Sequence, residues 1–472
     1  MLGDEVKSQF ELQHRCLSES LSKNCVFKEP TRIGQLIRFL VLVVQYHALT
    51  PKRYNSFPTS TLSQRLQMLR FTRCGRSAEY IRSARFDHLT NCVQFVICVL
   101  TSLGMLHNCG ITSAQESSKT ELEKILADIC RKQQVPSLTI AVVRSDEIVT
   151  MECSGVRKSG TDDAIELSDR HPLGSNTKSM TATLAAKVVE SGKIKWDSTI
   201  RQVWPDAAPK HIHPSLHDVT LNELLSHQSG LAANLTDLGG NDWGSFFQEK
   251  ASPTVERRRM LMLIMKKKAK HSRGEYHYSN IGYVVAAAML EKSTGEEFEA
   301  MMHRDIFKPL KMDSADFRTL ASAKKLKAPL LWGHQDNGNP ISPRKAGAEN
   351  PSAYASAGTV HLAIADYAKY AQWHLAQKPA PVLSTQEALD HLHKGQIEVP
   401  SLGGKYGGGW IHLKTPLGPA MTHGGSNTNS YASIWIFPDK DFAAVVCSNA
   451  GLKFGFPASD KAVQELIKRY AK

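Results

Sequence analysis

The stretch SYASIWIFPDKDFAAVVCSNA, residues 430–450, decides the fold class. It holds two runs of aromatic, β-branched and small apolar residues, 434–437 and 443–446, on either side of the polar segment Pro-Asp-Lys-Asp. Such runs favour strands, and proline and aspartate between them favour a tight turn. We therefore predict a β-hairpin in this stretch.

A second stretch of the same design lies much earlier in the chain. In SLTIAVVRSDEIVTMEC, residues 137–153, two β-rich runs flank the polar segment 144–147. This pattern also predicts a hairpin. The two hairpins are separated by nearly 300 residues, so any sheet that contains both of them closes around the middle of the chain.

An amphipathic helix is predicted outside each hairpin. SKTELEKILADICRKQQ, residues 118–134, offers Ser118 and Thr120 as caps, and SDKAVQELIKRYAK, residues 459–472, offers Ser459. The apolar faces consist of Leu122, Ile125, Leu126 and Ile129 in the first helix, and of Val463, Leu466, Ile467 and Tyr470 in the second.

Helix and hairpin at one end, with hairpin and helix at the other, predict an α+β fold. Both ends would contribute to one antiparallel sheet, and both helices would cover it. We assign a single domain to residues 116–472, with a sheet subdomain at about 116–175 and 400–472. A mainly helical insertion, about 176–399, would lie between the two parts of the sheet.

Composition excludes several classes of protein. The chain has 472 residues, a net charge of +13 and a hydrophobic content of 42%, which is typical of a folded globular protein. About half of the surplus charge falls in the irregular, basic extension 1–115, where the arginines are scattered and carry no nucleic-acid signature. Six of the nine cysteines precede residue 115 and none forms a Cys-x-x-Cys pair, so we expect neither a disulfide framework nor a zinc ribbon.

An apolar run of about 14 residues, 93–106, is too short to cross a bilayer, which needs about 20. With arginines before it and a small-residue stretch ending at Ala114 after it, the segment at about 82–114 is typical of a signal peptide. Its distance from Met1 leaves three accounts: a start downstream such as Met68 with an exported product, a membrane anchor, or a buried helix. We favour export to the periplasm or the exterior over a cytoplasmic location, and expect membrane association through this segment alone.

The first candidate for chemistry is Ser175-x-x-Lys178. The two side chains would share one face of a helix, close enough for a neutral lysine amine to take the serine proton. The spacing is not specific, and context selects this pair because a helix with Met180, Leu184 and Val188 on one face follows it. The other matches lie in charged or proline-broken stretches: Ser20/Lys23, Ser322/Lys325 and Ser342/Lys345.

Two further motifs could serve such a serine. In EYHYSNIGYVVAAAMLEKSTG, residues 275–295, Tyr278 could relay a proton and Asn280 could dock a carbonyl group, although the pair could equally cap the helix that follows. In MTHGGSNTNSYASIW, residues 421–435, His423 and two glycines enter a strand where a ligand could approach closely. An ordinary glycine bulge beside a histidine is the alternative.

No metal or cofactor is expected. His211, His213 and His217 are close in sequence, but no acidic residue lies at ligand spacing from them. We expect His227 to pack or hydrogen-bond locally rather than to act as a general base.

In these motifs, residues 118–472 resemble the serine β-lactamase-like hydrolases, the group of class C β-lactamases, DD-peptidases, D-aminopeptidases and family VIII esterases. The resemblance rests on an ordered set of short motifs rather than on any one of them. The set comprises GSNTKSM (174–180), LLSHQSGL (224–231), YHYSNIGY (276–283), FKPLKMDSADF (307–317), YGGGW (406–410) and THGGSN (422–427).

The resemblance implies a role for each matching position. Ser175 would be the acylated nucleophile, Lys178 its base and Tyr278 the partner in proton transfer. Asn280, His423, Gly424 and Gly425 would line the substrate site, and the backbone N–H groups of Ser175 and Ser426 would form the oxyanion hole. No metal or cofactor would take part.

His423 departs from the lysine that β-lactamases usually present. A histidine is mostly neutral at pH 7 and attracts a substrate carboxylate less. We therefore expect a serine hydrolase that acts on an ester or amide of a small molecule or peptide through an acyl-enzyme. The alternative is a catalytically weak penicillin-binding or scaffold protein that keeps the fold. The oligomeric state stays open.

Overall fold

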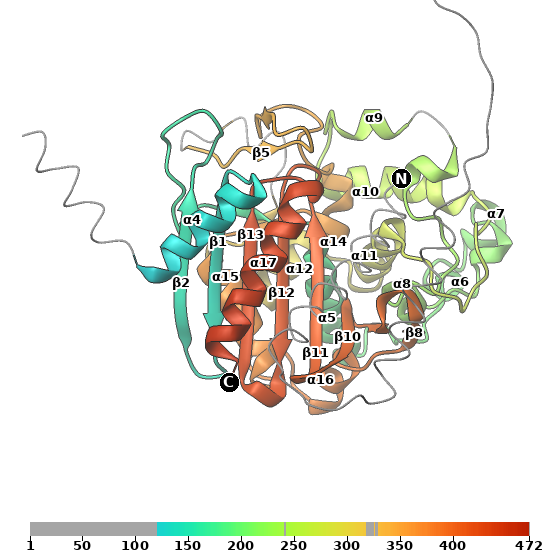
Figure 1. Ribbon diagram of the computed structural model, residues 1–472. Helices are drawn as coiled ribbons and strands as arrows, with labels where there is room; N and C mark the ends of the chain where they lie inside the picture. The colour runs from blue at the N-terminus through green and yellow to red at the C-terminus, as the bar shows by residue number, and fades with distance from the viewer. Residues whose placement is uncertain (1–119, 240–241, 318–324, 326–328, 472) are drawn as a thin grey trace, which may run out of the picture. The chain divides into compact units, whose positions relative to one another are not determined.

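The computed structural model describes residues 120–239, 242–317, 325 and 329–471. The extension 1–115 and its signal segment 82–114 lie outside the described residues. Figure 1 shows a large sheet with helices on both of its faces. Eight antiparallel strands follow one another in the order β2-β1-β13-β12-β11-β10-β9-β8.

Both ends of the described chain build this sheet, as predicted. Strand β1 (Ser137–Val143) pairs with β2 (Ile148–Gly155) and also with β13 (Phe442–Ser448), which pairs in turn with β12 (Tyr431–Phe437). The two predicted hairpins are confirmed, and so is the α+β class. The pairing of Leu138 with Ser448 brings together residues about 300 positions apart.

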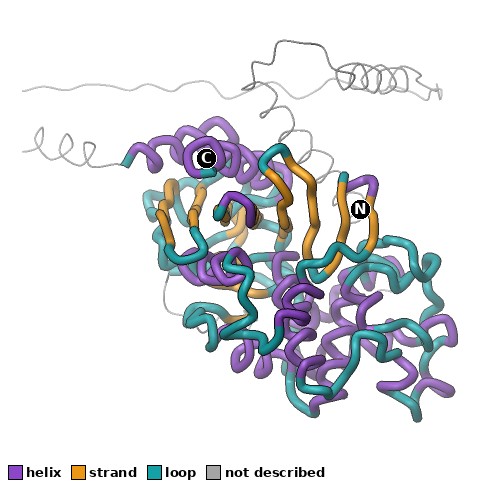
Figure 2. Tube along the Cα trace, turned by 90° about the horizontal axis from the view of Figure 1, so that it is seen from below, coloured by secondary structure: helices purple, strands orange, loops and turns teal. Residues whose placement is uncertain are grey.

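The sheet is buried on both faces, and alternate residues of one strand enter two different cores. Ile140 and Val142 pack with helices α4 (Glu121–Gln133) and α17 (Leu452–Tyr470), whereas Ala141 packs on the opposite side. Helix α15 (Ile364–Leu375) covers that opposite side, under β1, β12 and β13. Figure 2 shows the strands between the two layers of helices.

The first predicted helix begins where expected. The Thr120 side chain accepts a hydrogen bond from the Glu123 amide and so caps α4. The last helix begins earlier than predicted. Helix α17 starts at Leu452, so Ser459 is no cap and lies fully buried inside the helix.

Local sequence signals misplace the start of α17 because Gly455 and Pro457 lie in its first two turns. A helix-interior proline costs about 3 kcal/mol in isolation. Here the burial of Phe456 and Ala458 offsets this cost. Gly455 lets the helix approach β12, since a β-carbon there would lie 2.7 Å from the Cβ of Tyr431.

The chain between β2 and β8 is mainly helical and carries two small sheets, β3-β7-β4 and β5-β6. The proposed boundaries of the sheet subdomain and the helical subdomain stay a prediction. The helices are α5 (Thr177–Glu190), α6 (Ile200–Val203), α7 (Ala208–His211), α8 (Leu221–Leu225), α9 (Trp243–Phe246), α10 (Pro253–Met265), α11 (Asn280–Thr294), α12 (Phe298–Met302), α14 (Ala355–Gly358) and α16 (Gln386–Leu392). The remaining strands are β3 (His171–Pro172), β4 (Asp316–Phe317), β5 (Gly333–His334), β6 (Pro340–Ile341), β7 (Val360–Leu362), β8 (Ile397–Val399), β9 (Gly404–Gly407), β10 (Trp410–Thr415) and β11 (Gly418–Ser426). Within the part of the chain that the structure describes, no helix combines the length and apolar character needed to span a membrane.

Candidate active site

Ser175 lies in a single 3-10 turn, Gly174–Asn176, that leads directly into α5. Helix α5 is buried on nearly every side, including the polar residues Thr177, Lys178 and Ser179 of its first turn. The predicted apolar face at Met180, Leu184 and Val188 is buried, but the whole helix runs through the core. A buried helix therefore delivers Lys178 into an interior from which water is excluded.

Two glycines bring the backbone of Ser175 against strand β11. Gly174 has a φ of +53°, and a β-carbon on it would lie within 2.7 Å of three backbone atoms of Ser426. A β-carbon on Gly425 would lie 2.6 Å from the Ser175 backbone nitrogen. Only glycine permits this approach, which sets the backbones of Ser175 and Ser426 side by side.

Lys178 has three hydrogen-bond partners, and none of them is acidic. Its Nζ lies 3.0 Å from Ser175 Oγ, 2.7 Å from Asn280 Oδ1 and 2.7 Å from the carbonyl oxygen of Ala357. The side chain is fully buried. Burial lowers the pKa of Lys178 well below its usual value, because no carboxylate compensates for the lost hydration of the ammonium group.

Tyr278 lies in the segment that precedes α11, and its hydroxyl donates to Ser175 Oγ at 2.8 Å. The side chain of Ser279, rather than that of Tyr278 or Asn280, caps α11 by accepting from the Gly282 amide. Tyr278 and Asn280 are therefore free of the capping role that the sequence allowed them. Burial raises the pKa of Tyr278, so the phenol stays protonated at neutral pH.

The orientation of the Asn280 amide follows from its two partners. Its Oδ1 accepts from Lys178, and its Nδ2 donates to Oδ1 of Asn234 at 2.8 Å. Asn234 is itself buried. Asn280 thus presents oxygen rather than nitrogen to the lysine.

His423 is buried on β11 and belongs to the same group of side chains. Its Nδ1–H donates to the carbonyl oxygen of Gly424 at 2.6 Å, and Nε2 lies 3.3 Å from the Tyr406 hydroxyl. Burial, aided by the nearby Lys178, lowers the pKa of His423 to about 3. The ring is therefore neutral at physiological pH and supplies no positive charge to a ligand.

The structure thus brings the sequence-predicted residues together from three separate stretches of chain. Ser175, Tyr278, Asn280 and Ser426 are partly exposed, whereas Lys178, His423, Gly424 and Gly425 are buried. A reacting partner can therefore reach the Ser175 hydroxyl from solvent, whereas the Lys178 amine lies in the buried part of the site.

Some contributing residues escaped the sequence analysis. The Ala357 carbonyl and the Asn234 amide carry no local signal, since each acts through a contact with a residue distant in sequence. The sequence did offer a signal for Tyr406, because this residue belongs to YGGGW, one of the motifs on which the resemblance rests.

The histidine cluster expected to be metal-free makes ordinary hydrogen bonds. His213 contacts Ser215, and His217 contacts the carbonyl oxygens of Ala208 and Ile212. Across the described residues, no three His, Cys, Asp or Glu side chains gather in a way that could hold a metal ion.

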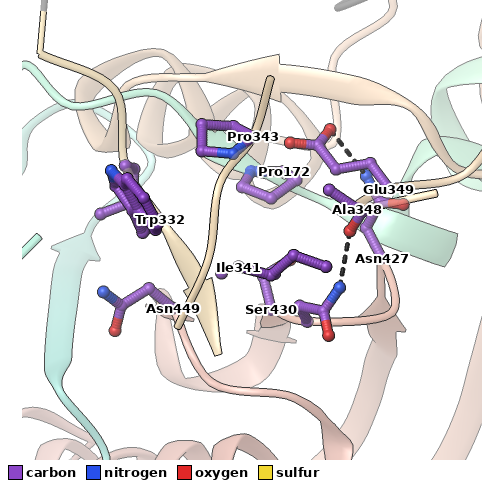
Figure 3. A pocket seen from close by; sticks show the side chains of 12 residues that line it. Pro172, Trp332, Ile341, Pro343, Ala348, Glu349, Asn427, Ser430 and Asn449 are labelled. Atoms are coloured by element: carbon purple, nitrogen blue, oxygen red, sulfur yellow. Dashed lines mark hydrogen bonds between the residues drawn. The ribbon is translucent and has the colours of Figure 1, made fainter. Parts of the chain in front are cut away.

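A separate pocket lies beside β3, the strand that precedes Ser175 in the sequence. Figure 3 shows Pro172, Trp332 and Ile341 along it, with Glu349 and Asn427 at one side. Ser175, Lys178, Tyr278 and Asn280 are not among the residues that line it. The pocket is therefore distinct from the Ser175 site.

With this geometry established, comparisons with known proteins identify the family. A family model described as Beta-lactamase matches residues 121–467. The chain belongs to the β-lactamase family. The resemblance predicted from the motifs is confirmed, and so is the predicted fold.

Within this family, the chain is 24% identical to penicillin-binding protein 4 of Amycolatopsis lactamdurans over 335 residues, 69% of this chain and 84% of that protein. It is 25% identical to unguisins hydrolase ungD of Aspergillus violaceofuscus (strain CBS 115571) over 270 residues, 55% of this chain, and spans about half of that relative's length, 46%. The octameric penicillin-binding protein homologue from Pyrococcus abyssi superposes with a TM-score of 0.60 at 22% identity, over 74% of this chain and 78% of that one.

The β-lactamase family assignment establishes the class of activity. The chain is a serine hydrolase that acts on ester or amide bonds, with small molecules or peptides as substrates. The low identities leave the acyl group undetermined, because one fold serves many substrates.

Proposed function

We propose that Ser175 is the nucleophile of this hydrolase, that Lys178 activates it and that Tyr278 carries the proton onward. One observation supports all three roles. Lys178 Nζ and Tyr278 OH converge on the same Ser175 Oγ, at 3.0 Å and 2.8 Å. Both distances are within the range required for direct proton transfer.

Proton counting supports the direction of transfer. A neutral lysine amine has two N–H donors and one lone pair. The oxygens of Asn280 and Ala357 can only accept, so they take the two N–H groups. The lone pair then faces Ser175 Oγ, and the serine hydroxyl donates to it.

Acylation follows from this arrangement. Ser175 Oγ forms a bond to the acyl carbon while its proton moves to Lys178 Nζ, which then has three acceptors for its three N–H groups. The carbonyl oxygen becomes an oxyanion near the backbone N–H groups of Ser175 and Ser426. General-base catalysis contributes about 10²–10⁴-fold to such reactions, and each oxyanion donor about 10²–10³-fold.

Collapse of the tetrahedral intermediate breaks the bond to the leaving group. The leaving oxygen or nitrogen takes a proton from Tyr278 OH, and the Lys178 ammonium returns a proton to the phenolate that is left. Hydrolysis of the acyl-enzyme reverses this path, with water giving its proton to the same pair. Each protein group ends the cycle in its starting state.

His423 supports a substrate class without a carboxylate beside the scissile bond. With the pKa of His423 near 3, the third motif carries no charge at neutral pH. The partly exposed amide of Asn280 offers polar contacts instead. We therefore propose as substrate an ester or amide of a small acyl group that carries no carboxylate, rather than a penicillin or a peptide C-terminus.

Labelling with a fluorophosphonate tests these assignments. We expect one equivalent of probe on Ser175, complete loss of labelling in Ser175→Ala, and unchanged labelling in Ser342→Ala, which removes the serine of another Ser-x-x-Lys match. Short-chain p-nitrophenyl esters and D-amino-acid amides should be turned over faster than nitrocefin. Probe on any other residue would refute the assignment.

The same panel tests the alternative of a penicillin-binding or scaffold protein. That alternative predicts one equivalent of acylation followed by no release of product. Multiple turnovers of any ester or amide that disappear in Ser175→Ala would refute it.

We also propose that the protein is exported. The support is the sequence of the segment 82–114 alone, with its apolar run at 93–106. N-terminal sequencing of native protein should show a start at residue 115. A native protein that retains residues 82–114 would contradict cleavage there.

A further inference from the structure

His227 occupies a backbone position that favours glycine. It follows helix α8 and its last capping residue, Ser226, and has a φ of +62°. The amide of Gln228 donates to the Glu223 carbonyl oxygen at 2.8 Å and closes the end of the helix. Glycine usually takes the left-handed residue of such an end, since a β-carbon there costs roughly 1–2 kcal/mol. A histidine at this position suggests a use for the side chain.

The hydrogen bonds of His227 lie on both sides of Tyr278. The His227 backbone carbonyl oxygen accepts from the amide of His277 at 2.8 Å. The ring Nδ1 accepts from the amide of Ser279 at 3.1 Å. One residue thus holds the backbone immediately before and immediately after the tyrosine.

The ring of His227 also packs against the tyrosine that it brackets. Its centroid lies 4.3 Å from that of Tyr278 and 4.6 Å from that of Tyr406. Tyr406 reaches His423 through its hydroxyl. The imidazole therefore packs against both Tyr278 and Tyr406, the residue that contacts His423.

The protonation state of His227 fits this role. Because Nδ1 accepts a hydrogen bond, a neutral ring carries its proton on Nε2. Complete burial lowers the pKa of His227 well below its usual value, and the nearby Lys178 and His423 act in the same direction. The ring therefore stays a hydrogen-bond acceptor at Nδ1 throughout the neutral range.

We infer that His227 is a positioning residue that holds the Tyr278 hydroxyl at Ser175 Oγ. This inference rests on the proposed function of Tyr278 and deepens it. His227 makes no hydrogen bond to Ser175, Lys178 or the Tyr278 hydroxyl, and acts through the backbone and ring of Tyr278. Its removal should slow the chemical step while substrate binding is little changed.

Two substitutions separate the acceptor from the rest of the side chain. His227→Leu removes the acceptor at similar volume. His227→Asn places an amide oxygen at the position of Nδ1, and asparagine tolerates a left-handed backbone. We expect kcat for a p-nitrophenyl ester to fall about 10–100-fold in His227→Leu, with KM changed less than threefold and most of the kcat restored in His227→Asn.

A double-mutant cycle with Tyr278→Phe supplies a readout that a general structural role would not change. If His227 acts through Tyr278, His227→Leu in the Tyr278→Phe background should lower kcat less than threefold further. An equal loss in both backgrounds, or no loss in either, would overturn the inference.

A matched control addresses backbone strain. Gln134 ends α4 with a φ of +57°, away from the site, and Gln134→Leu should introduce comparable strain without loss of kcat. Should His227→Leu fail to fold, His227→Gln replaces it. The amide oxygen of glutamine lies one bond farther from the backbone than that of asparagine, so it is displaced from the position of Nδ1. A kcat of His227→Gln equal to that of wild type would then refute the inference.

The outcome is distinguishable from failure of the proposed function. If wild-type protein forms no acyl-enzyme at Ser175, the proposed function fails before His227 is tested. If wild type turns over and His227→Leu does so at the same kcat, the function stands and the positioning role is wrong.

Discussion

Two fully buried basic side chains in this protein have opposite surroundings. Lys178 hydrogen-bonds to a hydroxyl and two neutral oxygens, whereas Arg257 of α10 pairs with the carboxylates of Glu291 and Glu299. Both are 0% exposed. Burial lowers the pKa of Lys178, while the two glutamates raise the pKa of Arg257 despite its burial.

This difference teaches how the fold makes a base. A buried amine without a counter-charge releases its proton, since the ammonium form has lost its hydration without compensation. A buried guanidinium between carboxylates stays charged and joins α10 to α11 and α12. The first environment is suited to catalysis and the second to structure.

The largest effect that would test the comparison comes from Lys178→Met. We expect kcat/KM for an ester to fall about 10³-fold or more, because the general base is lost. Thermal stability should fall less than in Arg257→Met, since the Asn280 and Ala357 oxygens lose a donor but no opposite charge is left unpaired. Lys178→Arg should be equally inactive, because a guanidinium stays protonated. A loss below tenfold in either variant would show that Lys178 is not the base.

The converse experiment is Arg257→Met. Removing one partner of a buried ion pair costs about 3–5 kcal/mol, and here it leaves two carboxylates, Glu291 and Glu299, without their cation. Denaturant unfolding measures this cost. The matched control on the same helix is Arg259→Met, whose pair with Glu256 is partly exposed and should be worth about 0–1 kcal/mol. Equal losses in the two variants would contradict the comparison.

The smallest effect concerns histidines whose pKa is lowered mainly by loss of hydration, as that of Lys178 is. Burial lowers the pKa of His393 to about 3, as it does for His423. The unfolded chain therefore binds more protons between about pH 6.5 and 3, and stability should fall as the pH falls through this window. Each group contributes up to about 1.4 kcal/mol per pH unit.

Urea unfolding at several pH values from 7 to 4 measures this slope. His393→Gln should make the slope shallower by about one proton. An unchanged slope in this variant would show that His393 is not responsible.

Most of the large elements were predictable because their signals are local. The hairpins of β1-β2 and β12-β13 and the cap at Thr120 depend on residues within a few positions of one another. The predicted start of α17, at Ser459, was wrong. The helix begins at Leu452, because burial of Phe456 against the sheet overrides the local effect of Pro457. No local signal predicts that α15 covers the sheet, because this depends on its contacts with β1, β12 and β13, which are distant in sequence.

The candidate site was predictable in its residues but not in its chemistry. Spacing proposed four Ser-x-x-Lys pairs, and the helix that follows Ser175 selected one of them. Nothing local indicated that the Ala357 carbonyl oxygen and the Asn280 amide oxygen would accept hydrogen bonds from Lys178 Nζ. Those partners lie 179 and 102 positions away in the chain.

The amino-acid sequence by itself determined the hairpins β1-β2 and β12-β13, the helices α4, α5 and α11, the position of Ser175 at the start of a helix, and the presence of a histidine, His423, in the motif THGGSN. Only the tertiary structure decided that Lys178 is buried among neutral acceptors and that His227 brackets Tyr278. The physical reason is that the pKa of a side chain and the orientation of a hydroxyl depend on surroundings supplied by distant segments. A local pattern specifies which groups are present, and folding specifies what each group faces.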